Sequence, residues 1–394
     1  MSAALDLRFL RQGGQTVEDI AGTLSAFLAT AQRDVAIAIY DFHVESEPAQ
    51  VIARTLQDLH HRGVRVRIVD HDEREARREV PDNVPRPAAP PEYIDALGLD
   101  VRPVIGFGTL MHHKYAVVDG ERVWTGSMNW TEHSFTLQEN CIVTLDNALV
   151  AAAYLRDFEE LWNRPKHLEK SGRFDAEWVD ATCDGQPVRV RPYFCPGRGP
   201  ELAALIASRI ECARERIVIC SPVLTSGPIL GALADVVGRG VVPVTGVVDR
   251  TQMHDVLHQW GGLPKASWKP DAFRFIASAA NFGGKRSIPW GPHTIHDFPA
   301  RQARGLRRLG VRRVVQQPLA RGRGERRERA RDRRQGRRRS RGRGDPRVRG
   351  ALPVGPRRPV AAALFRTRQL DGRRPQFAPE RLEHRASQLR HVNG

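Results

Sequence analysis

Two stretches of this chain repeat one pattern at a spacing of 177 residues, and this repeat limits the possible folds most strongly. Residues 55–70 read TLQDLHHRGVRVRIVD, and residues 232–249 read ALADVVGRGVVPVTGVVD. Each stretch predicts a helix that ends at a glycine, followed by a β-branched strand closed by aspartate. An apolar strand is expected ahead of each, at 34–42 and at 215–223. Each half therefore reads strand–helix–strand, which favours parallel pairing and an α/β layered fold.

The length of 394 residues allows two domains with cores of their own. We expect a first domain over 1–165, a polar linker over 166–187 and a second domain over 188–298. Residues 72–92 are charged and then proline-rich, which predicts a surface loop. The apolar residues of 147–164 recur at helical spacing and predict a helix with its Phe and Trp in the core.

The remaining residues, 299–394, differ in composition from the rest. They hold 30 Arg, no Lys and 7 acidic residues, which gives a net charge of +23. Residues 1–298 keep 32 basic and 38 acidic residues, a net charge of −6, so the tail alone produces the net +17 of the whole chain. Arg-rich sequence with poor periodicity is expected to be disordered. The acidic remainder gives no support for a broad DNA-binding surface and is compatible with a small basic cleft.

The start of the chain has charges among its apolar residues and no apolar run of about 7–15 residues, which argues against a signal peptide. No window approaches the roughly 18 apolar residues that a spanning helix needs. The five cysteines are scattered and lack metal-ligand spacing. We therefore expect a cytoplasmic protein without a transmembrane anchor, with non-classical export left open.

The stretch 111–129, MHHKYAVVDGERVWTGSMN, gathers polar groups around one expected strand–turn–strand unit. His112 and Lys114 are two residues apart on a strand, so both side chains should share one face. His113 should point the other way. Asp119 and the glycine after it predict the turn. Such a hairpin brings the polar groups of the motif to one end.

These groups suit attack on a phosphodiester. Histidine can act as a nucleophile or proton carrier near neutral pH, and a lysine ammonium neutralises a phosphoryl oxygen. Ser127 and Asn129 follow the second strand and can donate hydrogen bonds to the phosphate oxygens. Either Asp119 or Glu139 can orient the imidazole.

The spacing His-x-Lys-x4-Asp-x6-Gly-Ser-x-Asn, followed by Glu139–Asn140, resembles the HKD motif of the phospholipase D superfamily. The repeat extends this resemblance to residues 15–298, since family members are often two similar halves with one motif each. It implies two α/β sandwich halves, each a mixed sheet flanked by helices.

The resemblance also implies a mechanism that needs no metal and no cofactor. One motif histidine attacks phosphorus, the histidine of the other motif protonates the leaving alcohol, and water then cleaves the phosphohistidine. In this chain the expected catalytic residues are His112, Lys114 and Asp119, the expected phosphate-binding residues are Ser127 and Asn129, and Glu139 is expected to orient the histidine.

The repeat places a second motif near residue 289, where no His-x-Lys occurs. Lysine is absent after Lys285 and tryptophan after Trp290, and Arg-rich text of this kind is typical of GC-rich DNA read out of frame. A shifted frame, read from the codon of Ala300 onward, permits His-x-Lys-x4-Asp-x5-Gly-Ser-x-Asn. We therefore hypothesise that the chain from about Pro299 is translated in the wrong frame. The alternative is a genuine, disordered basic tail.

Three functions remain in competition. The first is a hydrolase of phosphodiesters, with phospholipid as the preferred substrate because two-motif bacterial family members commonly act on it, and with a nuclease or phosphatidyl transferase next. The second is an inactive product with one motif. The third is a nucleic-acid-binding protein that acts through its Arg-rich tail. If the chain is active as written, two copies share their His112 residues across a homodimer, as single-motif family members do. His293 and His296 lack the third ligand that a metal site needs.

Overall fold

The computed structural model describes residues 3–72, 94, 96–105, 110–289 and 297. Our expectations for the tail 299–394, for the reading frame, for His293 and His296, and for nearly all of the surface loop 72–92 lie outside the described residues.

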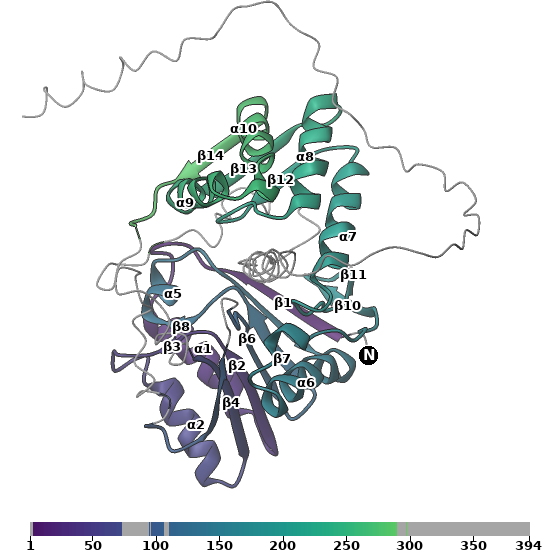
Figure 1. Ribbon diagram of the computed structural model, residues 1–394. Coiled ribbons are helices and arrows are strands. Elements are labelled where there is room, and N and C mark those ends of the chain that lie inside the picture. Colours follow the sequence, from purple (N-terminus) through teal and green to yellow (C-terminus); the bar gives the residue numbers. More distant parts are fainter. Residues whose placement is uncertain (1–2, 73–93, 95, 106–109, 290–296, 298–394) are drawn as a thin grey trace, which may run out of the picture. The chain divides into compact units, whose positions relative to one another are not determined.

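The described chain contains both strands and helices (Figure 1). The strands are β1 (Ala3–Phe9), β2 (Asp34–Ile39), β3 (Phe42–His43), β4 (Arg65–Asp72), β5 (Asp100–Ile105), β6 (Lys114–Val118), β7 (Arg122–Gly126), β8 (Trp130–Thr131), β9 (Cys141–Asp146), β10 (Val179–Cys183), β11 (Gln186–Val190), β12 (Ile217–Cys220), β13 (Val244–Asp249) and β14 (Asn281–Lys285). The α-helices are α1 (Val17–Ala29), α2 (Val51–His61), α5 (Glu132–Thr136), α6 (Ala148–Asn163), α7 (Gly199–Glu211), α8 (Gly227–Arg239), α9 (Arg250–Gly261) and α10 (Lys269–Ala279).

Nine of these strands form one mixed sheet in the order β11-β10-β1-β9-β7-β6-β2-β4-β5. Strands β2, β4 and β5 run parallel, whereas the successive pairs β2–β6, β6–β7, β7–β9 and β9–β1 are antiparallel. The parallel part is the βαβ unit predicted from the sequence, and the antiparallel part contains the predicted hairpin.

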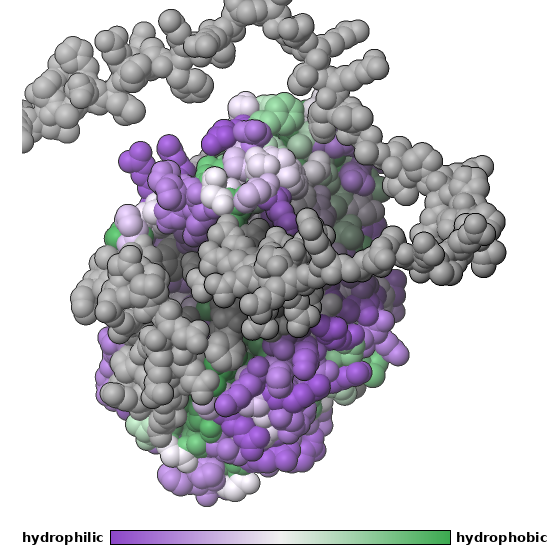
Figure 2. Space-filling model, in the orientation of Figure 1, coloured by the Kyte–Doolittle hydropathy of each residue, from purple (hydrophilic) through white to green (hydrophobic). Residues whose placement is uncertain are grey.

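Helices cover both faces of this sheet, because β2 is apolar on both sides. Leu24 of α1 and Leu56 of α2 pack with Ile37 in one buried cluster, and Phe158 of α6 packs with Val117 in a second cluster on the opposite face. Figure 2 shows mainly hydrophilic side chains over the region of α6, as expected for a helix whose apolar side faces the sheet. The predicted α/β sandwich with a mixed sheet is confirmed for the first half.

The second repeat forms its own parallel sheet, β12-β13-β14, with a core shared by α8, α9 and α10. Its order and direction match those of β2-β4-β5. Gly63 and Gly240 follow the equivalent helices with φ angles of 85° and 60°, a left-handed conformation that glycine adopts at little cost. In the described residues this sheet ends at β14, the counterpart of β5, so the second half reaches the point where its motif hairpin would begin.

The expected linker 166–187 is more than a connection. Strand β10 pairs in parallel with β1, with Ala3 opposite Ala181, and β11 pairs with β10. Val179 and Ala181 are buried in the core under α6, so apolar burial joins these strands to the first sheet. None of the described helices combines the length and the apolar composition needed to cross a bilayer.

Candidate functional site

Apart from Asp119, the motif residues meet at one edge of the nine-stranded sheet, where the central strands begin or end; this edge is called the site edge below. Ile39, the last residue of β2, pairs with Lys114, the first residue of β6. Gly126, the last residue of β7, pairs with Ile142 near the start of β9. Because neighbouring strands alternate in direction here, the end of β2, the start of β6, the end of β7 and the start of β9 lie at the same edge.

His112 and Lys114 lie around the ring of Tyr40, the residue that follows β2. The His112 and Tyr40 ring centroids are 4.6 Å apart, and the Lys114 Nζ lies 4.8 Å from the Tyr40 ring centroid. The same ammonium donates a hydrogen bond of 3.0 Å to the His112 carbonyl oxygen. The two side chains therefore share one side of the chain, as their two-residue spacing predicts.

His113 faces the opposite side, also as predicted. Its ring lies 5.6 Å from that of Tyr115, and its Nε2 is 3.4 Å from Oδ2 of the fully buried Asp157. Tyr115 donates a hydrogen bond of 2.8 Å to the same carboxylate oxygen. His113 thus belongs to a buried polar cluster under α6.

Burial sets the electrostatics of the site. It lowers the pKa of Lys114 to about 7, and the nearby Asp41 carboxylate acts in the opposite direction. Burial also lowers the pKa of His112 well below its usual value of 6.5, and positive charge at Lys114, His113 and His71 lowers it further. At neutral pH the His112 imidazole is therefore unprotonated, which is the form that can attack phosphorus.

Ser127 and Asn129 follow β7 but differ in their bonding. The Ser127 hydroxyl donates to Asn140 Oδ1 at 2.8 Å and accepts the Cys141 N–H at 2.9 Å. It therefore joins the end of β7 to the start of β9 and closes the connection between them. The Asn129 Oδ1 is buried and has no hydrogen-bond partner among the described residues. Gly126, the last residue of β7, directly precedes Ser127 and has a φ of 145°. A Cβ at this position would lie 2.1 Å from the Cys141 carbonyl oxygen.

Asp119 lies at the other end of β6, away from His112. Its carboxylate accepts the backbone N–H groups of Gln32, Arg33 and Asp34 at 2.9, 2.7 and 3.0 Å. Burial tends to raise the pKa of Asp119, but these backbone hydrogen bonds lower it overall. The expectation that Asp119 acts in catalysis or orients the imidazole is corrected here, because five strand residues separate it from the site edge. It instead ties the β6–β7 turn to the start of β2.

Glu139 lies two residues before β9, and its carboxylate is bound by a lysine that is distant in the sequence. Lys285 Nζ contacts Glu139 Oε2 at 3.0 Å, and the two side chains are only 12% and 7% exposed. Burial raises the pKa of Glu139, and Lys285 opposes this effect. The expected role of Glu139 in orienting His112 stays a prediction, since its contact in the structure is with Lys285 at the end of β14.

Comparison with known proteins identifies the domain that holds this edge. A family model described as "Cardiolipin synthase, PLD-like domain" matches residues 24–162, which include the whole motif. The first domain of this chain belongs to the phospholipase D superfamily. Helix α2, strands β2 to β9, the second half of α1 and all but the last residue of α6 lie in the matched region of this phospholipase D-like domain.

Several known proteins are similar to part of this chain. Mitochondrial cardiolipin hydrolase of Xenopus laevis is 36% identical over 135 residues, which cover 34% of this chain and 57% of that protein. The Homo sapiens protein of the same name is 35% identical over 114 residues, 29% of this chain and 41% of that protein. The chain thus spans about half the length of these curated relatives. Among solved structures, the phospholipase D family member Nuc from Salmonella typhimurium is 22% identical, with a TM-score of 0.32, and covers 41% of this chain and 95% of its own.

Three residues of the phospholipase D-like domain reach the site from outside the motif, and sequence reasoning missed them. They are Tyr40 and Asp41, directly after β2, and His71, near the end of β4. The available signal was the position of polar side chains at the carboxyl ends of parallel strands, where α/β sheets commonly bind ligands.

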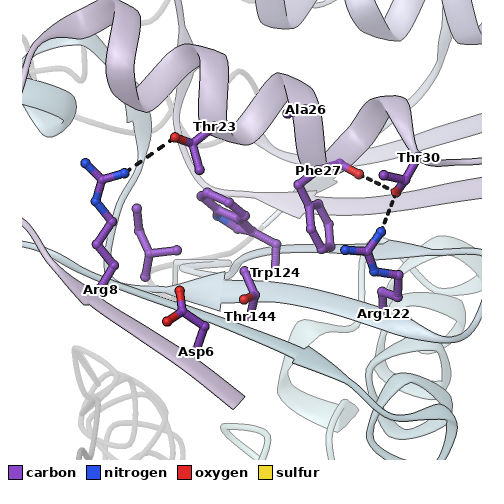
Figure 3. Close-up of a pocket in the computed structure, with 10 residues that line it drawn as sticks. Asp6, Arg8, Thr23, Ala26, Phe27, Thr30, Arg122, Trp124 and Thr144 are labelled. Carbon is purple, nitrogen blue, oxygen red and sulfur yellow. Dashed lines mark hydrogen bonds between the residues drawn. The ribbon is translucent and has the colours of Figure 1, made fainter. Parts of the chain in front are cut away.

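A surface depression of about 310 Å³ lies elsewhere in the phospholipase D-like domain, between α1 and strands β1, β7 and β9 (Figure 3). Its two arginines already have partners: Arg8 donates to Thr23 at 3.4 Å, and Arg122 donates to Thr30 at 2.7 Å. Arg122 stands at the start of β7, next to the β6–β7 turn, so this depression is separate from the edge that carries His112.

Replacing Asp119 with alanine should destabilise the domain more than it changes the site. The substitution removes the acceptor of three backbone amides, and we expect a loss of about 2–4 kcal/mol in the free energy of unfolding. Urea denaturation followed by tryptophan fluorescence measures this. The control, Asp58→Ala at an exposed position of α2, should stay within about 0.5 kcal/mol of the parent. Equal stability of the two variants would contradict the anchoring role.

Proposed function

We propose that this protein is a phosphodiesterase that hydrolyses the head-group phosphodiester of a phospholipid, with His112 as the nucleophile. One observation carries the proposal: an unprotonated imidazole and a lysine ammonium both lie close to the centroid of the Tyr40 ring, at 4.6 and 4.8 Å, at one sheet edge. A nucleophile beside a cation is the arrangement that attack on a phosphoryl group requires.

In the proposed reaction an imidazole nitrogen of His112 forms a bond to phosphorus, and the bond from phosphorus to the leaving alcohol breaks. The alcohol takes its proton from a second histidine. Water then attacks phosphorus, the phosphorus–nitrogen bond breaks, and the phosphate monoester leaves with His112 restored. Lys114 neutralises charge on the phosphoryl oxygens, and Asn129 and the Gly126 turn border the same edge. Ser127 acts as a bridge that keeps this turn closed.

The second histidine can come from two sources. If the chain beyond about residue 299 is out of frame, the corrected sequence supplies a second His-x-Lys in the second half. Resequencing the gene across codons 285 to 335 tests this, because a missing or extra base must appear there. If the frame stands, two chains must pair their His112 residues, and the rate should then fall with the square of protein concentration at high dilution. A corrected frame would also remove the basis for nucleic-acid binding by the Arg-rich tail.

The names of the similar proteins favour a phospholipid over a nucleic acid as substrate, since they are cardiolipin hydrolases. The test offers vesicles that contain cardiolipin and, separately, a labelled single-stranded oligonucleotide, each with and without a primary alcohol. Release of phosphatidic acid supports the proposal. Oligonucleotide cleavage alone would make the protein a nuclease, and exchange onto the alcohol would make it a phosphatidyl transferase. Acid-quenched protein should carry phosphate on His112. The cytoplasmic location expected from the sequence stays a prediction, which fractionation of the cell of origin tests.

The pH dependence of kcat/KM should report two groups of the free enzyme. His112 must be unprotonated to attack, so activity is lost as the pH falls through its lowered pKa, well below 6.5. Lys114 must carry its proton, so activity is also lost as the pH rises through its pKa of about 7. We therefore expect a maximum on the acid side of pH 7.

A Lys114→Arg variant separates the two limbs, because arginine stays protonated throughout this range. It should keep the acid limb and lose the alkaline limb, at a lower overall rate. An unchanged alkaline limb in this variant would show that another group controls it.

A further inference from the structure

We propose that His71 is a positioning residue of this site, which fixes the segment before β6 and the ring of Tyr40 and thereby the orientation of His112. The consequence for catalysis rests on the proposed function, whereas the consequence for the geometry of His112 does not. His71 lies outside the motif, 41 residues before His112, near the end of β4.

The first contact is a hydrogen bond to the motif segment. The backbone N–H of Met111 donates to His71 Nδ1 at 3.3 Å, and Met111 is fully buried. This amide immediately precedes His112, so the bond fixes the peptide from which the nucleophile projects. His71 itself is held by the sheet, where it pairs with Val104 of β5.

The second contact passes through Tyr40. The His71 ring stacks on the Tyr40 ring with centroids 5.3 Å apart and an angle of 26° between the ring planes. Tyr40 in turn lies 4.6 Å from the His112 ring and 4.8 Å from the Lys114 ammonium. The Tyr40 ring therefore links His71 to both motif side chains, and a shift of His71 would release that ring.

The hydrogen bond from Met111 decides which ring nitrogen of neutral His71 carries the proton. An Nδ1 that accepts the Met111 N–H cannot carry a proton, so the neutral ring has its proton on Nε2. Protonation of Nδ1 would break the bond to Met111 and add a positive charge beside His112. Among the described residues, the charges of Lys114 and His113 also act on His112, and the charge of Asp41 acts on Lys114. Substitution of His71 should loosen the contacts that keep His112 buried. Because burial is the main cause of the lowered pKa of His112, that pKa should then rise.

Three substitutions separate the contacts. His71→Asn keeps an acceptor near the position of Nδ1 without the ring, His71→Phe keeps the ring without the acceptor, and His71→Ala removes both. His61→Ala, at an exposed site on α2, is the matched control. Nuclear magnetic resonance on histidine-labelled protein observes the His112 ring directly, with His112→Ala used to assign its signals.

We expect the nuclear Overhauser contact between the His112 and Tyr40 rings to weaken in His71→Ala and to be partly restored in His71→Asn. The His112 titration should move to higher pH in all three variants and stay unchanged in His61→Ala. In turnover assays His71→Ala should lower kcat about 10- to 100-fold with little change in KM, and His71→Asn should recover part of the loss.

The outcomes distinguish the two proposals. An unchanged ring contact and an unchanged titration of His112 in folded His71→Asn and His71→Phe would overturn the role of His71, whether or not the parent is active. If the parent shows no turnover while the ring contact and the titration change as expected, the proposed function fails and the positioning role of His71 stands. Since two of the variants keep half of the contacts, a folding defect in His71→Ala leaves the test intact.

Discussion

Turnover of a phospholipid by the protein should fall by about four orders of magnitude or more when His112 is replaced by alanine, because no other group can form the covalent bond to phosphorus. The effect should appear in kcat and in kcat/KM alike, since Lys114 would still attract the phosphate. Single-turnover release of the head group from cardiolipin vesicles measures it. The fold should be unaffected, because His112 stands before β6 and outside the hydrophobic core clusters.

The adjacent histidine provides a demanding control for this experiment. His113→Ala changes the same type of residue one position away, on the side that faces Asp157. We expect it to keep turnover within about 10-fold of the parent, because it removes a neighbouring charge and a packing contact but not the nucleophile. Retained turnover in His112→Ala would refute the assignment of the nucleophile. Equal losses in both variants would point to a structural effect of the whole segment.

The largest effect on stability is expected for Gly126→Ala. Gly126 has a φ of 145°, which L-residues rarely adopt, and the added Cβ would lie 2.1 Å from the Cys141 carbonyl oxygen. That oxygen accepts the Ser127 N–H at 3.0 Å, so the clash cannot be relieved without opening the turn beside the site. We expect a loss of about 3–5 kcal/mol in the free energy of unfolding. Urea denaturation followed by circular dichroism measures it.

Gly22→Ala is the matched control for this substitution. Gly22 lies on the exposed side of α1, and a Cβ there meets nothing within 4 Å. Alanine favours the helix over glycine by about 0.5–1 kcal/mol, so this variant should be slightly more stable than the parent. Similar stability of the Gly126 and Gly22 variants would mean that the turn after β7 tolerates a side chain, contrary to its geometry.

The repeat and the hairpin could be predicted because local chemistry decides them. Gly63 and Gly240 end their helices with positive φ angles, and Asp119 and Gly120 form the turn with φ angles of 54° and 70°. These conformations favour a small set of residue types, so the sequence marks them directly. The same logic predicted that the side chains of His112 and Lys114 would lie on one side.

The surroundings of the motif could not be predicted in the same way. His71 reaches Met111 across 40 residues, and Glu139 meets Lys285 across 146 residues. Such contacts depend on strand order, and β-strand order was not determined by the spacing of the motif. The parallel pairing of β10 with β1 was missed for the same reason, since only the assembled sheet brings Ala3 opposite Ala181.

Asp119 shows that the spacing of a motif does not by itself predict the role of each of its residues. A fixed spacing from the histidine suggests a shared role, but the spacing also fits the length of one strand followed by a turn. The five residues of β6 carry the chain from the site edge to the far edge, where Asp119 binds the backbone amides ahead of β2. The regular spacing in this part of the motif therefore reflects the geometry of a hairpin as much as chemistry.

The pairing of β1 between β9 and β10 decides how the first domain can be produced by itself. A fragment cut to the family match, residues 24–162, would lack β1 and expose the edge of β9, and a fragment ending at residue 165 would leave β1 without β10. Open strand edges are templates for aggregation, so both fragments should express as insoluble protein. A fragment of residues 3–190 contains all nine strands of the sheet. It is the shortest continuous piece in which every strand pair of the sheet is kept, and so the one to choose for crystallography and enzymology.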